Sequence, residues 1–266
     1  MPTHTSTDPD ILALTGLHLF HATLSNSSMR VRLLLEEKGL EWTSHVLDAS
    51  RQDNLSEAYL RINPTSLIPS LVHDGRVVTE TNDILYHIDA LSPDPRLAPD
   101  AGPDQDAMRA WVDRAASSHP TTLKPWMYAV TGAKTKRPED MARYRQIQSD
   151  AALVAFHQRS LDGFSEEEVA DAVRRNHAIL QEMEDALQKT PWLVGDRYTL
   201  ADVAWFPNVL ILHLLGFPTA PYPAVRQWLE AIQRRPACGP RVRQGVFRLP
   251  RWAVRLAVGL RKTLRG

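Results

Sequence analysis

The strongest constraint on the fold is the order of strand-like and helix-like patterns in the first third of the chain. Residues 17–20 alternate as a half-buried strand does. A polar stretch at 25–28 then opens a helical pattern that continues to Lys38, where a glycine follows and ends it. Residues 43–47 predict a second strand and residues 56–61 a short helix. The chain therefore begins β-α-β-α.

Two further strands are predicted at 69–72 and 76–79. An Asp-Gly pair lies between them, and this dipeptide is a strong signal for a β-hairpin. A helical pattern over 81–91 completes the order β-α-β-α-β-β-α. This order predicts a compact α/β domain over residues 17–92.

The rest of the chain predicts helices. A proline-rich break at 93–103 indicates a linker between domains. Residues 104–236 predict an all-helical domain. We expect the polar segment 1–16 to be flexible, and residues 237–266 to form a basic tail with an amphipathic helix over 251–265.

Two capping patterns mark helix starts in the helical region. Ser165 and Glu168 fit a capping box before a long helix, and Thr199 with Asp202 fits another before the most apolar helix of the chain. We interpret Asp202 as a structural residue, because a capping acid needs no catalytic role.

Charge is balanced overall but unevenly distributed. Thirty-one basic and 31 acidic residues give a formal net charge of zero, so no overall field favours nucleic acid as a partner. After Glu230, however, the chain has no acidic residue and ten basic ones: Arg234, Arg235, Arg241, Arg243, Arg248, Arg251, Arg255, Arg261, Lys262 and Arg265.

Cys238 is the only cysteine, which excludes an internal disulfide and a cysteine-based metal site. No other group of residues has convincing metal-ligand spacing. The first residues lack the order of a secretory signal, and no apolar run reaches the length that spans a bilayer. We therefore expect a cytoplasmic protein.

Several segments together resemble the glutathione transferase superfamily. They are Ser25 to Arg32, Asn63-Pro64 with Ile68-Pro69, Val78 to Thr81, and Trp192 to Asp202. The last is similar to the folding motif of that family's helical domain. The resemblance covers residues 17–236 and implies a thioredoxin-like α/β domain followed by an all-α domain, with glutathione as co-substrate.

Two branches of the superfamily are the most similar. Residues 23–39 and 59–63 resemble bacterial tetrachlorohydroquinone dehalogenases. Residues 73–80 resemble the glutathione-dependent β-aryl etherases of lignin breakdown. The resemblance alone does not rank the two.

Ser25, Asn26 and Ser27 are the catalytic candidates. The thiol of glutathione attacks as a thiolate, so a protein must lower its pKa. A helix N-terminus favours an anion, and a serine hydroxyl can donate a hydrogen bond to sulfur. The alternative is that all three merely cap the helix. Ser27 stands where the similar dehalogenases carry a catalytic cysteine, which favours conjugation or displacement over reductive chemistry.

The resemblance implies four glutathione-binding residues. Ile68 precedes Pro69 across a bond implied to be cis, and its extended backbone would bind the cysteinyl part of glutathione as an added strand does. Glu80 would meet the γ-glutamyl ammonium, and Thr81 its carboxylate. Relatives often place Lys or Gln at the position of Leu67, so Arg51 or Gln52 would have to bind the glycyl carboxylate instead.

Trp126 and Tyr128, with His119 as a third candidate, are expected to line a substrate pocket between the domains. Aromatic side chains there suit an aromatic substrate. An ordinary role in helix packing is about as well supported for any one of them.

These features predict a glutathione-dependent transferase, whose thiolate attacks an electrophilic carbon of a hydrophobic and preferably aromatic substrate, by conjugation or β-aryl ether cleavage. The alternative is a catalytically weak or inactive binding protein with the same fold. We expect the protein to form a homodimer. We expect no nucleic-acid partner. The basic tail predicts either peripheral contact with a membrane or packing against the helical domain.

Overall fold

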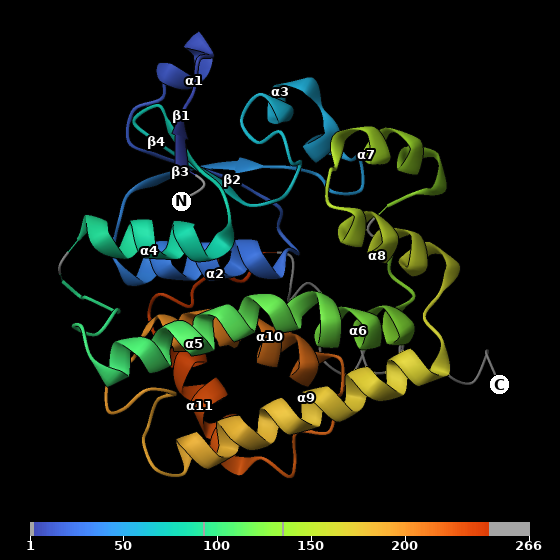
Figure 1. Cartoon of the computed structure of the whole chain (residues 1–266). Helices are drawn as coiled ribbons and strands as arrows, with labels where there is room; N and C mark the ends of the chain where they lie inside the picture. The colour runs from blue at the N-terminus through green and yellow to red at the C-terminus, as the bar shows by residue number, and fades with distance from the viewer. Residues whose placement is uncertain (1–2, 93, 135, 245–266) are drawn as a thin grey trace. The chain divides into compact units, whose positions relative to one another are not determined.

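The computed structural model describes residues 3–92, 94–134 and 136–244. Contacts divide the chain into two units (Figure 1). The first unit runs to Leu91 and includes Lys134–Gly163. The second unit comprises Ser92–Ala133 and resumes at Phe164.

The first unit is built on a five-stranded mixed sheet with the order β1-β5-β4-β2-β3. Only β2 and β3 pair in parallel, and the other pairs are antiparallel. Its elements are β1 (Thr3–Thr5), α1 (Pro9–Leu12), β2 (Leu17–His21), α2 (Asn26–Glu37), β3 (Trp42–Val46), η1 (Asp53–Leu55), α3 (Glu57–Leu60), β4 (Ser70–His73), β5 (Arg76–Val78), α4 (Thr81–Leu91), η3 (Pro138–Asp140), α7 (Met141–Ile147) and α8 (Ala151–Asp162).

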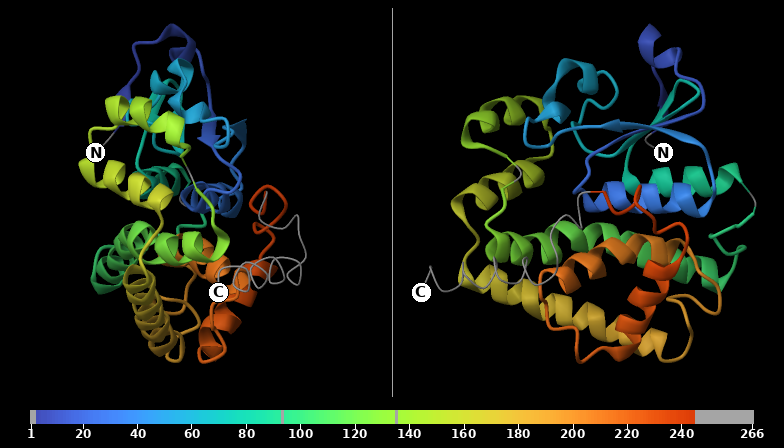
Figure 2. Two further views of the ribbon diagram at one scale, coloured as in Figure 1. Left: turned by 90° about the vertical axis from the view of Figure 1, so that its right-hand side faces the viewer. Right: turned by 180° about the vertical axis from the view of Figure 1, so that it is seen from behind.

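Helices α2 and α4 pack side by side on one face of this sheet (Figures 1 and 2). On the other face, Val72 and Val77 pack in an apolar cluster with Ile11, Tyr59 and Ile62 of the α1 and α3 regions. The predicted strands, helices and hairpin between residues 17 and 91 are all present, with ends that differ by a residue or two. The predicted α/β domain is confirmed.

The second unit is helical. It contains α5 (Pro103–Ser118), the π-helical turn η2 (His119–Leu123), α6 (Lys124–Thr131), α9 (Glu166–Leu187), α10 (Leu200–Leu214) and α11 (Pro223–Arg234). Helix α10 is apolar and buried almost all round, and it packs along α5, while α11 and α6 pack on α9. Both predicted capping boxes are present, at Ser165 with Glu168 and at Thr199 with Asp202.

The prediction that residues 1–16 are flexible is wrong for the part that the structure describes. Strand β1 pairs antiparallel with β5, and Asp8 caps α1. Ile11 is buried, and Asp8 forms an ion pair with Arg61 at 2.7 Å. This segment is ordered because it completes the sheet and covers the α3 side of the core.

The prediction of a single helical domain over 104–236 also needs correction. Segment 134–163 packs with the first unit, where Met141 and Tyr144 form an apolar cluster with Leu55. Lys136 Nζ donates to Gln52 Oε1 at 3.0 Å, and another side chain of the segment, Gln148, donates through Nε2 to the carbonyl of Thr65 at 2.9 Å. These contacts connect segment 134–163 to the η1 region and to the loop before β4.

Among the described residues, no helix has the length and apolar character needed to cross a bilayer. The amphipathic helix predicted over 251–265 lies outside the described residues. Its contact with a membrane stays a prediction.

Two histidine pairs occur in the first unit. His18 Nδ1 lies 2.9 Å from His45 Nε2, and His73 Nδ1 lies 3.0 Å from His87 Nε2. The ring of His45 also stacks on Phe20. Burial, followed by the charge of His18, lowers the pKa of His45. Burial likewise lowers the pKa of His87, with smaller effects of His73 and Arg76.

These pairs predict sensitivity to acid. A histidine with a lowered folded-state pKa binds fewer protons when folded than when unfolded, so the free energy of unfolding should decrease as pH falls below about 6.5. Urea unfolding between pH 7.5 and pH 5 measures this. The variant His45→Phe should show a shallower decrease, whereas His4→Phe, on exposed strand β1 outside either pair, should follow the wild type. Equal slopes for wild type and His45→Phe would contradict the prediction.

Candidate active site

The N-terminus of α2 holds the three catalytic candidates. Ser25 is the N-cap, and its Oγ accepts from the backbone N–H of Ser28 at 3.2 Å. Asn26 is buried, at 3% exposure, whereas Ser25 and Ser27 are half-buried. In the described part of the chain the Ser27 side chain makes no hydrogen bond. In the helix cap the Ser25 oxygen acts as a hydrogen-bond acceptor. The hydroxyl hydrogen of Ser25 can still donate to a group outside the helix.

A buried arginine that the sequence analysis did not single out holds the loop before α2. Arg32 Nη1 donates to the carbonyl of Ala22 at 3.1 Å, and Nη2 donates to that of Thr23 at 3.0 Å. Nη1 also donates to His21 Nδ1 at 3.0 Å. Arg32 is fully buried, so three strong hydrogen bonds fix the backbone that leads to Ser25.

Arg30 is also buried on α2, at 1% exposure. Burial lowers the pKa of Arg30 to about 9 and that of Arg32 to about 10. Both values lie above neutral pH, so both side chains stay cationic there. The first half of α2 thus combines a helix N-terminus with two buried positive charges, and this combination favours an anion.

The Ile68–Pro69 peptide bond is cis, as the resemblance implied. The loop before it is held by buried polar groups: Tyr59 Oη donates to the carbonyl of Leu67, and Asn63 Nδ2 donates to the same carbonyl at 3.0 Å. Tyr59 and Asn63 also bond Ser70 Oγ. Burial raises the pKa of Tyr59, which keeps its hydroxyl protonated as a donor.

Glu80 and Thr81 lie at the start of α4. Glu80 has a positive φ of 61° and an exposed side chain, and Thr81 is the first helical residue. Partial desolvation, and then the charge of Asp83, raise the pKa of Glu80. Two neighbouring carboxylates at this point favour a cation between them.

The sheet register brings these three segments to one end of the sheet. Phe20 pairs with Ser70, so the end of β2 lies beside the start of β4. Leu71 pairs with Val78, so the end of β5 lies there too. The predicted residues of the first unit lie within a few residues of these strand ends: Ser25, Asn26, Ser27, Ile68, Pro69, Glu80 and Thr81.

Arg51 and Gln52, the two residues predicted to bind the glycyl carboxylate, differ in how free they are to do so. Gln52 is buried and already bonds Lys136 and the carbonyl of Ala49. Arg51 is exposed and lies 3.5 Å from Asp48. Arg51 is therefore the better candidate to reach a bound carboxylate.

The predicted pocket residues belong to the second unit. Trp126 is 7% exposed and contacts Phe217 edge-on, and Tyr128 is 5% exposed and lies near Phe164. His119 is half-buried at the start of η2. Trp126 and Tyr128 thus take part in helix packing, and their contact with a substrate stays a prediction. Within the described residues no cluster of His, Cys, Asp and Glu side chains is arranged to hold a metal ion.

Together these features define a class of protein. A thioredoxin-like sheet domain with a cis-proline loop is joined to an all-helical part, which is the architecture of a glutathione transferase. A model of the glutathione S-transferase N-terminal domain matches residues 24–91, and one of the C-terminal domain matches residues 144–236. The chain belongs to the glutathione S-transferase superfamily, whose members use glutathione as co-substrate.

Relatives from both predicted branches are similar to this chain. Protein LigF of Sphingobium sp. strain SYK-6 is 28% identical over 79% of this chain and 87% of its own length. The crystal structure of this β-etherase superposes with a TM-score of 0.73 and 25% identity, covering 84% of this chain and 97% of the other. The tetrachloro-p-hydroquinone reductive dehalogenase of Sphingobium chlorophenolicum is 25% identical over 70% of this chain and 79% of its own.

Proposed function

We propose that this protein is a glutathione-dependent transferase whose site is the end of the sheet formed by the α2 N-terminus, the Ile68–Pro69 loop and the start of α4. The single observation that carries the proposal is this convergence of three segments in the first unit. Each segment offers the chemistry that one part of glutathione needs.

In this proposal the cysteinyl sulfur would lie at the N-terminus of α2. A partly buried helix N-terminus stabilises an anion by up to ~2 kcal/mol, or roughly 1.5 pK units. The hydroxyl of Ser25 or Ser27, or the amide of Asn26, would donate to the thiolate. Capping does not prevent this role for Ser25. The cap uses the Ser25 hydroxyl oxygen as an acceptor, whereas the sulfur would accept the hydroxyl hydrogen.

The remaining parts of glutathione would bind to the other two segments. The backbone of Ile68 would pair with the cysteinyl unit. Thr81, together with backbone N–H groups at the start of α4, would bind the γ-glutamyl carboxylate. Glu80 would bind the γ-glutamyl ammonium, assisted by the charge of Asp83.

The proposed reaction is attack of the glutathione thiolate on an electrophilic carbon. A carbon–sulfur bond forms as the bond to the leaving group breaks, and in β-aryl ether cleavage the leaving aryloxide then takes up a proton. Similarity to the β-etherase LigF favours this version. The first unit offers no thiol of its own, because the only cysteine, Cys238, is buried in the second unit. By the resemblance, Ser27 stands where the similar dehalogenases carry a catalytic cysteine.

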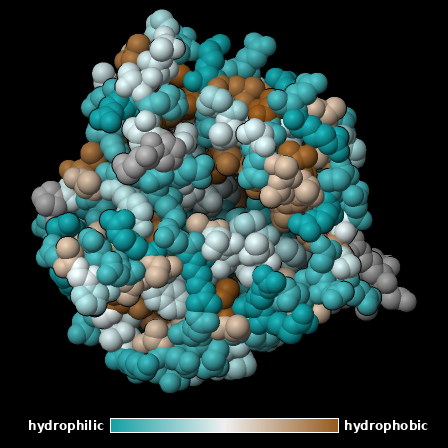
Figure 3. Space-filling model, in the orientation of Figure 1, coloured by the Kyte–Doolittle hydropathy of each residue, from teal (hydrophilic) through white to brown (hydrophobic). Residues whose placement is uncertain are grey.

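A hydrophobic substrate suits the surface next to the catalytic candidates. Leu24 directly precedes Ser25 and is 69% exposed, which is unusual for a large apolar side chain. The face shown in Figure 3 is largely hydrophilic, with hydrophobic residues in small separate groups. Trp126, Tyr128 and His119 stay predicted substrate contacts, and a homodimer stays the predicted assembly.

Alanine variants test the proposal. Ser25→Ala is expected to lower kcat/KM for glutathione conjugation of a chloronitrobenzene by roughly tenfold or more, because one hydrogen bond to a charged atom is lost. It should also lower the free energy of unfolding by about 1 kcal/mol through loss of the cap. Steady-state kinetics and urea unfolding measure the two effects.

Companion variants make the test specific. Asn26→Ala and Ser27→Ala show which side chain bonds sulfur, and Ser117→Ala on exposed α5 is the control. A protein that neither binds immobilised glutathione nor conjugates the probe, with no effect of any variant, would contradict the proposal and favour a binding protein without turnover.

A further inference from the structure

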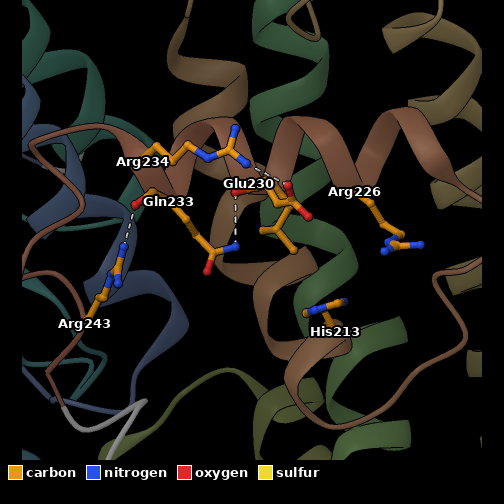
Figure 4. A pocket seen from close by; sticks show the side chains of 7 residues that line it. His213, Arg226, Glu230, Gln233, Arg234 and Arg243 are labelled. Atoms are coloured by element: carbon orange, nitrogen blue, oxygen red, sulfur yellow. Dashed lines mark hydrogen bonds and ion pairs between the residues drawn. The ribbon is translucent and has the colours of Figure 1, made fainter.

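A pocket of about 290 Å³ lies on the second unit, at a site that the proposed reaction does not use (Figure 4). Its wall is formed by α11, the end of α10 and the segment after α11. Leu229 supplies an apolar wall, and the polar lining residues are His213, Arg226, Glu230, Gln233, Arg234 and Arg243.

The lining of this pocket is cationic. Among the described lining residues, three guanidinium groups face one carboxylate, a formal excess of two positive charges. Glu230 forms an ion pair with Arg234 at 3.0 Å on the exposed face of α11. Glu230 thus offsets one of the three guanidinium charges, and the formal excess of two positive charges remains.

Arg226 is well placed to bind a ligand. It is exposed, and in the described part of the chain its side chain makes no hydrogen bond or ion pair. In Figure 4 it points toward the same space as His213. The ring of His213 is oriented by Thr219, with Nδ1 at 3.2 Å from Oγ1.

Arg243 lies on the opposite side of the pocket from Arg226 (Figure 4). Its Nη2 donates to the backbone carbonyl of Gln233 at 2.6 Å, which fixes the guanidinium at the end of α11. The side chain of Gln233 lies between the two cationic ends. A guanidinium binds the planar or tetrahedral oxyanions of carboxylate and phosphate with paired hydrogen bonds.

Two of the arginines that line the pocket come from the basic end of the sequence. Glu230 is the last acidic residue of the chain, and ten basic residues follow it. The same segment provides Arg234 and Arg243 to the pocket.

We propose that this pocket binds a small organic polyanion with an anionic group at each end, at least one of them a phosphate. Arg226 with His213 would bind one group and Arg243 with Gln233 the other, while Leu229 contacts the carbon skeleton. The size of the pocket matches a ligand smaller than a dinucleotide. All the residues that line it belong to the second unit, and none of them is a residue of the proposed glutathione site.

Calorimetric titration of the full chain with fructose bisphosphate, fructose monophosphate and fructose tests the proposal. Fructose bisphosphate is expected to bind at least tenfold more tightly than the monophosphate, and fructose not to bind. Arg226→Gln and Arg243→Gln should each weaken bisphosphate binding by about tenfold, as expected for loss of one charge-assisted contact. Both variants should also reduce the difference in affinity between the bisphosphate and the monophosphate.

Two further variants distinguish a specific site from a diffuse charge effect or from misfolding. Glu230→Gln removes the carboxylate of the pocket and should tighten bisphosphate binding, which a damaged fold cannot do. Arg143→Gln, on exposed α7 of the first unit, should change nothing. Absence of bisphosphate binding in the wild type would overturn the proposal. So would binding that Arg226→Gln and Arg243→Gln leave unchanged, or that Arg143→Gln weakens equally.

Discussion

Replacing Asp202 with alanine is expected to lower the free energy of unfolding by about 3–5 kcal/mol, a loss near the upper end for one substitution. Asp202 is fully buried. Its Oδ1 accepts from the backbone N–H of Leu193 at 3.1 Å and from Trp228 Nε1 at 2.8 Å. Its Oδ2 accepts from the N–H and hydroxyl of Thr199.

The cost is large because alanine leaves several buried donors without an acceptor at once. The carboxylate joins the loop before α10, the first turn of α10 and α11, so three parts of the second unit loosen together. Burial raises the pKa of Asp202, while the donors around it act in the opposite direction by favouring the charged form.

Urea unfolding, followed by tryptophan fluorescence, measures this effect. Asp202→Asn should retain part of the stability, since one amide oxygen can still accept. Asp196→Ala, at an exposed position near the same loop, is the matched control and should change the free energy of unfolding by less than about 0.5 kcal/mol. A similar small change for Asp202→Ala would contradict the role assigned to this carboxylate.

Replacing Arg32 with glutamine is expected to weaken glutathione binding by roughly tenfold and to lower the free energy of unfolding by about 2–4 kcal/mol. Arg32 holds the carbonyls of Ala22 and Thr23 and the ring of His21. Without the guanidinium, these buried acceptors lose their donor, and the loop before Ser25 is no longer fixed. The buried positive charge near the proposed thiolate is lost as well.

Arg32 is proposed to position the loop before Ser25 and not to touch glutathione. Its test therefore needs a measurement that a general loss of stability does not change. The thiol pKa of bound glutathione should rise in Arg32→Gln and be partly restored in Arg32→Lys, which keeps the charge but fewer donors. Arg61→Gln removes a partly exposed ion pair with Asp8, away from the Arg32 contacts, and is the control. An unchanged thiol pKa in Arg32→Gln at saturating glutathione would contradict the positioning role.

Much of the fold could be predicted from the sequence because its signals are local. The Asp-Gly pair between β4 and β5, the polar start of α2 and the boxes at Ser165 and Thr199 each depend on residues a few positions apart. Such short-range preferences act before any tertiary contact forms. The α/β domain and the start of α10 were therefore predictable.

The features that were missed depend on contacts between distant residues. Strand β1 exists because it pairs with β5, and segment 134–163 packs on the first unit through partners such as Gln52 and Thr65. No local pattern indicates either contact. A flexible first segment and a single helical domain were the simpler interpretations.

The candidate site was predictable in part. Ser25, Ile68 and Glu80 were identified through the resemblance, and the sheet register places their segments at one end. Arg32 was not predicted as a separate candidate. A charged residue on the apolar face of a helix nevertheless indicates a buried charge that must be hydrogen-bonded or paired. Trp126 and Tyr128 were predicted as pocket residues but are buried in helix packing. The sequence pattern of aromatic residues is the same in a core and in a pocket.

The most direct test of the central claim is the thiol pKa of glutathione bound to this protein, measured by ultraviolet absorbance of the thiolate as pH is varied. We expect a pKa below the value near 8.5 of a free cysteine thiol, with a partial return toward that value in Ser25→Ala. Glutathione that binds with an unchanged thiol pKa, or that does not bind at all, would contradict that claim.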